Sequence, residues 1–220
     1  MKRALNSQIA RVILIVPSCL IAFGIVSCSD DDDETTSSSD EIYNNVHDAV
    51  DLGLSVMWAT CNVGAESPED YGDYFSWGET ETKDSYTSSN CVTNGVEIDD
   101  IAGNAEYDAA TANWGDSWRM PTRNEFKELV NSCTWEWTTQ NNVDGYLVTG
   151  SNGNSIFLPA AGTRYETSLH YAGSEGYYWS STPIGSSTKY AYCLCFYSGS
   201  HIASYDITRY NGLTVRPVSE

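Results

Sequence analysis

Short runs of apolar and aromatic residues, broken by Gly, Asn and Pro, recur along most of the chain and predict strands. The stretch at 49–65 mixes β-branched, aromatic and apolar residues and predicts a strand pair at the start of a core. Further strands separated by turns are predicted at 135–139, 146–149, 155–159, 177–181, 190–197 and 214–218.

Helical spacing is clearest between residues 105 and 132. An Ala-rich stretch at 105–113 predicts a short helix. Thr122 and Glu125 have the spacing of a capping box, and apolar residues follow at helical intervals from Phe126. A second helix should therefore begin at this box and end near residue 131 or 132. By contrast, the polar stretch 66–106 carries isolated aromatics and predicts a long loop held by those side chains. These elements predict an α+β fold with loop-rich antiparallel sheets and one or two helices.

The first 27 residues predict a targeting signal. Lys2, Arg3 and Arg11 precede a largely apolar stretch at 12–26, which ends in Ser27-Cys28 and resembles the lipobox of bacterial lipoproteins. The resemblance implies cleavage before Cys28 and acylation of its thiol and new amine, so that the acyl chains anchor the protein in outer-membrane lipid. The alternative is an uncleaved anchor helix, but about 15 apolar residues fall short of the roughly 20 that a membrane span requires.

Residues 28–45 predict the lipidated Cys and a disordered tether. The run 29–40 reads SDDDDETTSSSD and contains no apolar side chain, so it should remain extended and solvated. A plain spacer explains this run, but an acidic run after a lipidated Cys also resembles an export tag of surface lipoproteins. We therefore expect an outer-membrane lipoprotein exposed on the cell surface, with one globular domain at 46–220.

Charge and composition exclude some partners. The chain carries 30 acidic against 11 basic residues, for a formal net charge of −19. Nucleic acids and anionic membranes attract clustered positive charge, so we expect no nucleic-acid partner. The aromatic content of 12% is typical of a folded domain, because disordered acidic chains are poor in aromatic residues.

Several motifs resemble one known family, the Fibrobacter succinogenes major paralogous domain, over roughly residues 48–219. They are WATCNVGA at 58–65, YGDYFSWGE at 71–79, WRMPT at 118–122, FLPAAG at 157–162 and GYYWSS at 176–181. The resemblance implies a C-type-lectin-like fold related to the formylglycine-generating enzymes, in which the two terminal strands pair and long loops gather on one side. It also implies a surface lipoprotein.

Catalytic and metal-binding signals are weak. The three His residues (His47, His170 and His201) lack metal-ligand spacing, and we expect no metal and no cofactor. Calcium binding by Glu97, Asp99, Asp100 and Asn104 is conceivable, but a solvated acidic loop explains the same residues. Neither the phosphate-binding glycine loop nor the Gly-x-Ser-x-Gly elbow occurs.

The cysteines do not match an enzyme pattern. Five lie beyond Cys28, namely Cys61, Cys91, Cys133, Cys193 and Cys195. The formylglycine-generating relatives use a Cys pair with several residues between, which Cys193-Leu194-Cys195 does not match. Cys61 and Cys133 are open to pairing or to burial as apolar residues, and we favour burial. We therefore expect no enzymatic activity.

Residues 177–211 carry nearly half of the 15 Tyr, together with many Ser and a single Lys. Tyr and Ser supply rigid contact area and adaptable hydrogen bonds, as in antibody paratopes, whereas a Tyr-rich core is the alternative explanation. Strand alternation over 190–197 places Tyr192, Leu194 and Phe196 toward the core and the intervening residues toward solvent or ligand. The predicted ligand-binding residues are Tyr178, Cys193, Cys195, Tyr197, His201, Ser204, Tyr205, Asp206, Tyr210 and Asn211. Arg209 and Arg216 are predicted to be structural, paired with buried carboxylates or carbonyls.

The same segment has a restricted composition. From Tyr190 to Asn211 it lacks Lys, Glu, Gln, Met and Trp, which are the residue types that randomising the first two bases of an Asn codon cannot produce. Some lectin-like domains are targets of diversity-generating retroelements, although an uncharged strand-rich segment would show the same absence. The function expected from the sequence is recognition of a protein or glycan by the Tyr-rich segment. Self-association as an adhesion subunit is the alternative, and a formylglycine-generating enzyme is the third.

Overall fold

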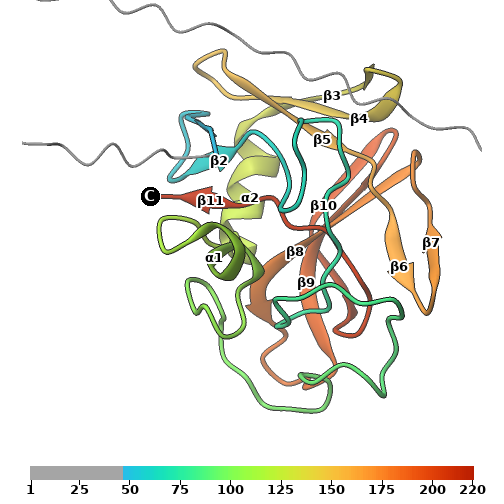
Figure 1. Ribbon diagram of the computed structural model, residues 1–220. Coiled ribbons are helices and arrows are strands. Elements are labelled where there is room, and N and C mark those ends of the chain that lie inside the picture. Colours follow the sequence, from blue (N-terminus) through green and yellow to red (C-terminus); the bar gives the residue numbers. More distant parts are fainter. Residues whose placement is uncertain (1–46) are drawn as a thin grey trace, which may run out of the picture. The chain divides into compact units, whose positions relative to one another are not determined.

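A computed structural model describes residues 47–220, so the predicted signal sequence, Cys28 and the tether lie outside the described residues. The described residues form antiparallel sheets, two helices and long loops (Figure 1), which confirms the predicted α+β class. The helices are α1 (Ala109–Trp114) and α2 (Arg123–Ser132). The strands are β1 Ala49–Val50, β2 Met57–Ala59, β3 Thr134–Gln140, β4 Val143–Thr149, β5 Ser155–Pro159, β6 Thr163–Tyr165, β7 Ser168–His170, β8 Glu175–Pro183, β9 Tyr190–Tyr197, β10 Ser200–Thr208 and β11 Val218–Ser219.

The two ends of the domain meet in one small sheet. Its strand order is β1-β2-β11, with Trp58 opposite both Val50 and Val218. The Ala59 amide also donates to the Pro217 carbonyl at 2.9 Å. This pairing of terminal strands is the feature that the C-type-lectin-like resemblance implies. The predicted strand at 214–218 is reduced to β11, because Thr214 and Leu213 form only isolated bridges with Tyr178 and Phe75.

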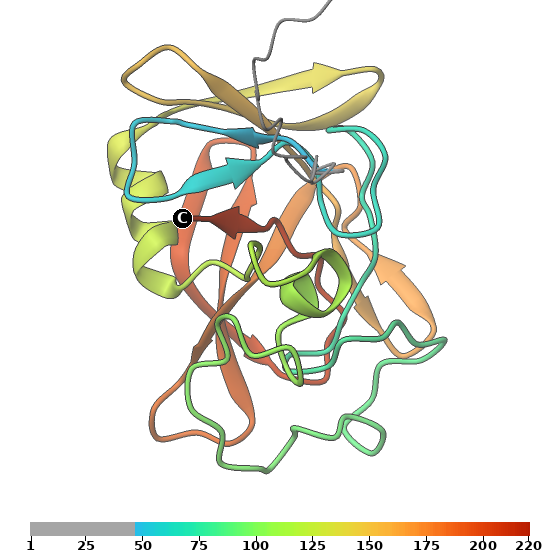
Figure 2. The same ribbon diagram turned by 60° about the vertical axis from the view of Figure 1, so that its left-hand side comes forward.

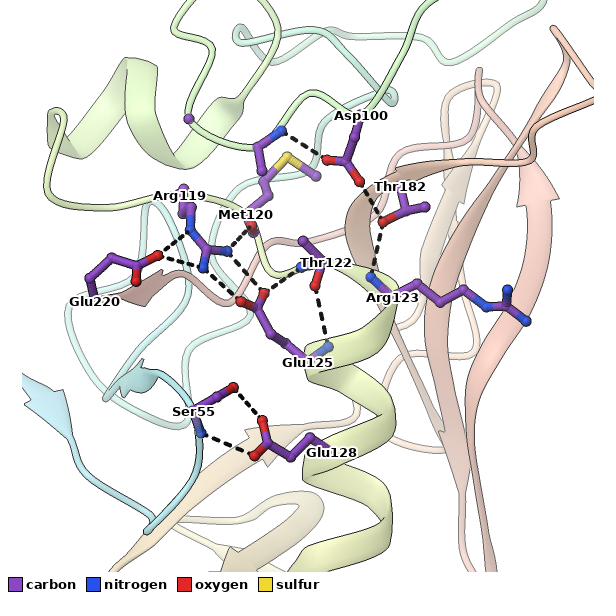
Figure 3. A network of polar contacts seen from close by, with 12 residues as sticks. Ser55, Asp100, Arg119, Met120, Thr122, Arg123, Glu125, Glu128, Thr182 and Glu220 are labelled. Carbon is purple, nitrogen blue, oxygen red and sulfur yellow. Dashed lines mark hydrogen bonds and ion pairs between the residues drawn. The ribbon is translucent and has the colours of Figure 1, made fainter.

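The capping box at the start of α2 is confirmed. The Thr122 hydroxyl accepts from the Glu125 amide at 3.3 Å, and the Glu125 carboxylate accepts from the Thr122 amide at 2.7 Å. The Arg119 guanidinium donates to both carboxylate oxygens of Glu125, at 2.9 and 2.6 Å, and to Glu220 at 2.9 Å (Figure 3). Two orphan backbone groups and one carboxylate are thus satisfied together, which fixes where the helix begins.

Two further contacts fasten α2 to its surroundings. Ser55 donates to the Glu128 carboxylate through both its amide and its hydroxyl (Figure 3). On the other side, the Arg123 amide donates to the Thr182 hydroxyl at 3.1 Å, and this hydroxyl donates to Asp100 at 2.7 Å. The helix is therefore tied both to the N-terminal strands and to the end of β8, while it packs along β8, β9 and β10 (Figure 2).

The central sheet, in the order β10-β9-β8, is covered on both faces. Leu194 and Phe196 of β9 lie in one apolar cluster with α2 residues, and Cys193 and Cys195 lie in a second cluster with the long-loop residues. The expectation that Cys193 and Cys195 face solvent is therefore wrong. The predicted alternation of side chains along β9 is correct, but the loop at 66–106 covers the face that was expected to be open to solvent.

Aromatic side chains hold the long loop, as predicted. The indole of Trp77 donates to the Ser180 carbonyl at 2.9 Å, and the indole of Trp179 donates to the Phe75 carbonyl at 2.7 Å. The Tyr86 hydroxyl donates to the Tyr74 carbonyl at 2.5 Å. All five aromatic side chains are buried, so the loop is anchored by ring packing and by hydrogen bonds to backbone carbonyls rather than by a strand ladder.

Arg209 and Arg216 are buried structural residues. Of the two predicted kinds of partner, carboxylates and carbonyls, the structure shows carbonyls. Arg216 is fully buried and donates to the carbonyls of Ala59, Thr60 and Phe157 and to the Asn62 side chain, at 2.8–3.1 Å. Arg209 stacks on Trp77 and donates to the carbonyls of Thr93, Val96, Ser187 and Tyr190. Each guanidinium thus joins segments that are distant in sequence.

Candidate ligand-binding surface

The structure divides the ten predicted binding residues into four places. Three of them are buried, namely Tyr178, Cys193 and Cys195. Two are exposed on one face of the central sheet, Tyr197 and Tyr205, and three belong to its other face, His201, Ser204 and Asp206. The last two, Tyr210 and Asn211, follow β10. The expectation that Tyr178 is available to a ligand is wrong. Its ring stacks on Phe196, and its hydroxyl donates to the Pro159 carbonyl at 2.7 Å.

The strand β10 forms one edge of the central sheet and carries a β-bulge. Ile202 lies opposite Cys195 and Tyr205 lies opposite Cys193, so three steps along β10 match two steps along β9. The extra residue shifts the alternation by one position. As a result, Ile202 and Tyr205 share the face on which Cys193, Cys195 and Tyr197 lie, although their spacing in sequence would place them on opposite faces.

Three large side chains on this face are accessible, and we call them the edge patch: Tyr197, Ile202 and Tyr205. Their exposed fractions are 47%, 41% and 40%, whereas Tyr177, Cys193 and Cys195 on the same face are buried. Ile202 was missed in the sequence because only the bulge brings it to this face. Contiguous exposed apolar surface is typical of an interaction site, and Tyr is enriched in such surfaces.

A rigid layer supports the edge patch. The Tyr205 ring contacts the buried Tyr177 ring edge-on, with centroids 6.1 Å apart. The Tyr177 hydroxyl donates to the Glu175 carboxylate at 2.5 Å. Burial, together with this bond to a carboxylate, raises the pKa of Tyr177 well above its usual range. Tyr177 therefore stays neutral and fixed, and Tyr205 is presented on a firm support.

The thiols beneath the patch are not activated. Burial raises the pKa of Cys195 to about 11, and burial also raises the pKa of Cys193 well above that of a free thiol. Both are free cysteines. A nucleophilic or redox-active cysteine requires a lowered pKa and access to solvent, and these two have neither. The geometry of this face suits binding rather than covalent chemistry.

On the opposite face of β10, His201 and Ser204 make intramolecular contacts, whereas Asp206 is exposed. His201 stacks on Trp135 with ring centroids 4.6 Å apart, and burial lowers its pKa. The Ser204 hydroxyl accepts from the Arg123 guanidinium at 2.9 Å. Asp206 lies opposite Tyr192, whose ring is covered by the same Arg123 at 4.0 Å. These three predicted residues therefore lie apart from the edge patch.

The last two predicted residues belong to a different region. Tyr210 lies beside Tyr165 of β6, with ring centroids 6.2 Å apart. The Asn211 side chain accepts from the Thr208 hydroxyl at 2.9 Å and so closes the turn after β10.

Within residues 47–220, no group of His, Cys, Asp and Glu side chains could hold a metal ion. No helix in the same range is long and apolar enough to cross a bilayer.

Comparison with known proteins gives one match. Residues 48–219 match the family model of the Lcl C-terminal domain, a family related to the one that the sequence motifs resemble. The matched span covers nearly all of the described residues and contains every strand of the central sheet. No curated protein and no solved structure matched the chain.

Proposed function

The chain belongs to the Lcl C-terminal domain family, and on this premise we propose that it is a lipid-anchored surface protein that binds a protein ligand through the edge patch. The family is of the surface and adhesion type, and it is not a known enzyme family. The observation that carries the proposal is that Tyr197, Ile202 and Tyr205 are accessible on one face of the central sheet, beside the buried residues of β8 and β9.

The shape and chemistry of the edge patch favour a protein over a small ligand. Tyr197 lies at the end of β9, and Ile202 and Tyr205 lie on the edge strand β10 beside it. Two of the three side chains are Tyr, which offers large contact area with few rotatable bonds. A handful of such anchors supplies most of the binding free energy in a protein interface. Because the chain is strongly acidic, a partner with basic residues around an apolar contact is expected.

The anchor and the location complete the proposal. The acyl groups on Cys28 hold the protein in outer-membrane lipid, and the acidic segment at 28–45 spaces the domain from the surface. The basic n-region, the lipobox-like end of the signal and the acidic run support this arrangement. The proposal includes no thiol chemistry at this face, since burial raises the pKa of both Cys193 and Cys195.

The test is a protein and glycan array probed with the full chain. A variant with Tyr197→Ala, Ile202→Ala and Tyr205→Ala should lose the protein signals that the parent chain gives. The matched control is Tyr165→Ala with Tyr171→Ala, which removes two exposed Tyr rings outside the edge patch and should leave the signals in place. Equal signals from the parent and the triple variant would refute the proposal.

Self-association is the second candidate, favoured by one observation. Within the described residues β10 pairs only with β9, so the outer side of this nine-residue strand is an open edge next to the edge patch. Sedimentation velocity of the full chain distinguishes the two functions. A dimer that the triple variant abolishes would favour self-association, whereas a monomer at all concentrations would leave the heterologous ligand as the function of the patch.

A further inference from the structure

One arginine of the described domain differs from the other four. The guanidinium groups of Arg119, Arg123, Arg209 and Arg216 all donate hydrogen bonds to side chains or carbonyls. The Arg164 side chain is half-buried and lies over the Tyr74 ring, 4.9 Å from its centroid. Among residues 47–220 its guanidinium has neither a hydrogen-bond acceptor nor an ion-pair partner. An oriented guanidinium with five unused N–H donors is available to an external acceptor.

This guanidinium lines a cavity of about 310 Å³ between β6 and the long loop. The other polar side chains that reach the cavity are Asp73, Thr82, Lys83 and Asp84. The Lys83 ammonium is already engaged, since it pairs with Glu79 at 2.6 Å and donates to the Asn90 carbonyl at 3.1 Å. Asp73, Thr82 and Asp84 are exposed, and their side chains make no hydrogen bond to another described residue. Tyr74 and Tyr86, both buried, complete the wall.

The mixed charge of the cavity determines which ligand fits. An anion that pairs with Arg164 would also meet the carboxylates of Asp73 and Asp84, and a cation that pairs with these carboxylates would meet the guanidinium. A neutral polyol avoids both conflicts, because one hydroxyl accepts from the guanidinium while its neighbour donates to a carboxylate. The volume lies at the lower end of small-molecule sites, about 300–1,000 Å³, which is adequate for one sugar residue.

We propose that the cavity formed by Arg164, Asp73, Thr82 and Asp84 binds a neutral sugar residue. Arg164 is the central donor, and Asp73 and Asp84 are the acceptors. The site lies on β6 and the long loop, whereas the edge patch lies on β9 and β10, so the two sites use different residues. The inference therefore goes beyond the proposed function: a surface protein of this kind would take a protein at the edge patch and a glycan at the cavity.

Saturation-transfer NMR on the full chain tests the proposal. The probes are the methyl glycosides of glucose, galactose, mannose and N-acetylglucosamine, with glucuronate and glucosamine as the anionic and cationic competitors. At least one neutral glycoside should bind, and it should bind more tightly than either charged sugar. Arg164→Gln should weaken its binding at least tenfold, whereas Lys189→Gln, which removes the same charge from an exposed side chain, should leave binding unchanged.

Two further variants keep the test decisive. Asp84→Asn changes an exposed side chain and should also weaken glycoside binding, which guards against misfolding of the Arg164→Gln variant. The edge-patch triple variant should bind the glycosides as the parent does, so failure of one proposal is distinguishable from failure of the other. The proposal is overturned if no neutral glycoside binds, if a charged sugar binds more tightly, or if both cavity variants bind like the parent.

Discussion

The ring of Tyr205 contacts the ring of Tyr177 edge-on, at 6.1 Å between centroids, next to the β-bulge of the edge strand. One ring is 40% exposed and the other is 8% exposed, so the pair crosses the boundary between surface and core. The buried member is held by its bond to Glu175. A binding side chain braced in this way loses little conformational freedom when a ligand arrives, which favours affinity.

The edge patch and the core below it should respond differently to truncation. Tyr197→Ala, Ile202→Ala and Tyr205→Ala each remove a side chain that is partly exposed, so each should lower the free energy of unfolding by less than about 1 kcal/mol. Tyr178→Ala should lower it by about 3–5 kcal/mol, because it empties a fully buried site and loses a hydrogen bond. Urea denaturation measures both. A large loss at Tyr205 would mean that its ring belongs to the core.

The Glu125 carboxylate predicts a pH dependence of stability. Burial opposes its ionisation, but hydrogen bonds from Arg119 and Thr122 outweigh burial and hold its pKa below the usual range. Its contribution is therefore complete above the unfolded pKa of about 4.3 and is lost as the pH falls through the lower folded pKa. The difference in unfolding free energy between the parent and Glu125→Gln should shrink below about pH 4.

A second comparison tests whether this pH dependence comes from the Arg119–Glu125 pair. In an Arg119→Met background the carboxylate loses its main partner, and the difference between Glu and Gln at residue 125 should become almost independent of pH. Urea denaturation across pH 3–7 supplies all four values of the cycle. A difference that persists unchanged at low pH would show that the Arg119–Glu125 pair does not stabilise the fold.

Arg216 should be one of the most sensitive positions in the domain. Arg216→Met leaves three carbonyls and the Asn62 side chain without their buried donor and should cost about 3 kcal/mol or more. Lys189→Met, which alters an exposed cation, should stay within about 0.5 kcal/mol of the parent. Urea denaturation of the two variants gives the comparison, and equal effects would contradict a structural role for Arg216.

Thiol reactivity tests whether the second core cluster is closed. Cys193 and Cys195 are buried with raised pKa values, so iodoacetamide at pH 7.5 should modify them only when the domain unfolds. Cys133 is half-buried and should react much sooner, although burial raises its pKa as well. Mass spectrometry of the labelled peptides gives the order. Early labelling of Cys193 would show that the long loop does not cover this face.

Lipidation of Cys28 is testable in a bacterium that processes lipoproteins. The full chain should incorporate labelled palmitate and should sediment with the membrane fraction. Cys28→Ser removes the acylated thiol and should abolish both, whereas Cys19→Ser alters a residue of the predicted signal and should retain both. Membrane sedimentation of the Cys28→Ser variant without label would instead favour the uncleaved anchor.

Local patterns in the sequence were sufficient for the elements that are fixed by local chemistry. The capping box of Thr122 and Glu125 located α2, and β5 and β9 have the predicted bounds. Apolar runs and side-chain capping act over a few residues, so a single sequence shows them. The short strands β6 and β7 were missed because their polar composition gives no apolar alternation. The edge strand β10 was missed because its β-bulge interrupts the alternation.

The candidate site was only partly predictable, for two physical reasons. Cys193 and Cys195 were expected at the surface because nothing in the sequence indicates that residues of the distant loop, such as Phe75 and Trp77, cover that face. Ile202 was missed because a β-bulge reverses the alternation between it and Tyr205. Long-range packing and strand register depend on contacts between distant segments, which periodicity does not contain.

The most direct test of the central claim is the affinity of the edge patch for a protein identified on the array, measured by surface plasmon resonance. The triple variant Tyr197→Ala, Ile202→Ala, Tyr205→Ala should bind at least about 100-fold more weakly than the parent, since hot-spot side chains contribute about 2 kcal/mol each. The control with Tyr165→Ala and Tyr171→Ala should bind within about twofold of the parent, a difference well below 1 kcal/mol. Unchanged affinity in the triple variant, or a loss confined to the control, would contradict the account.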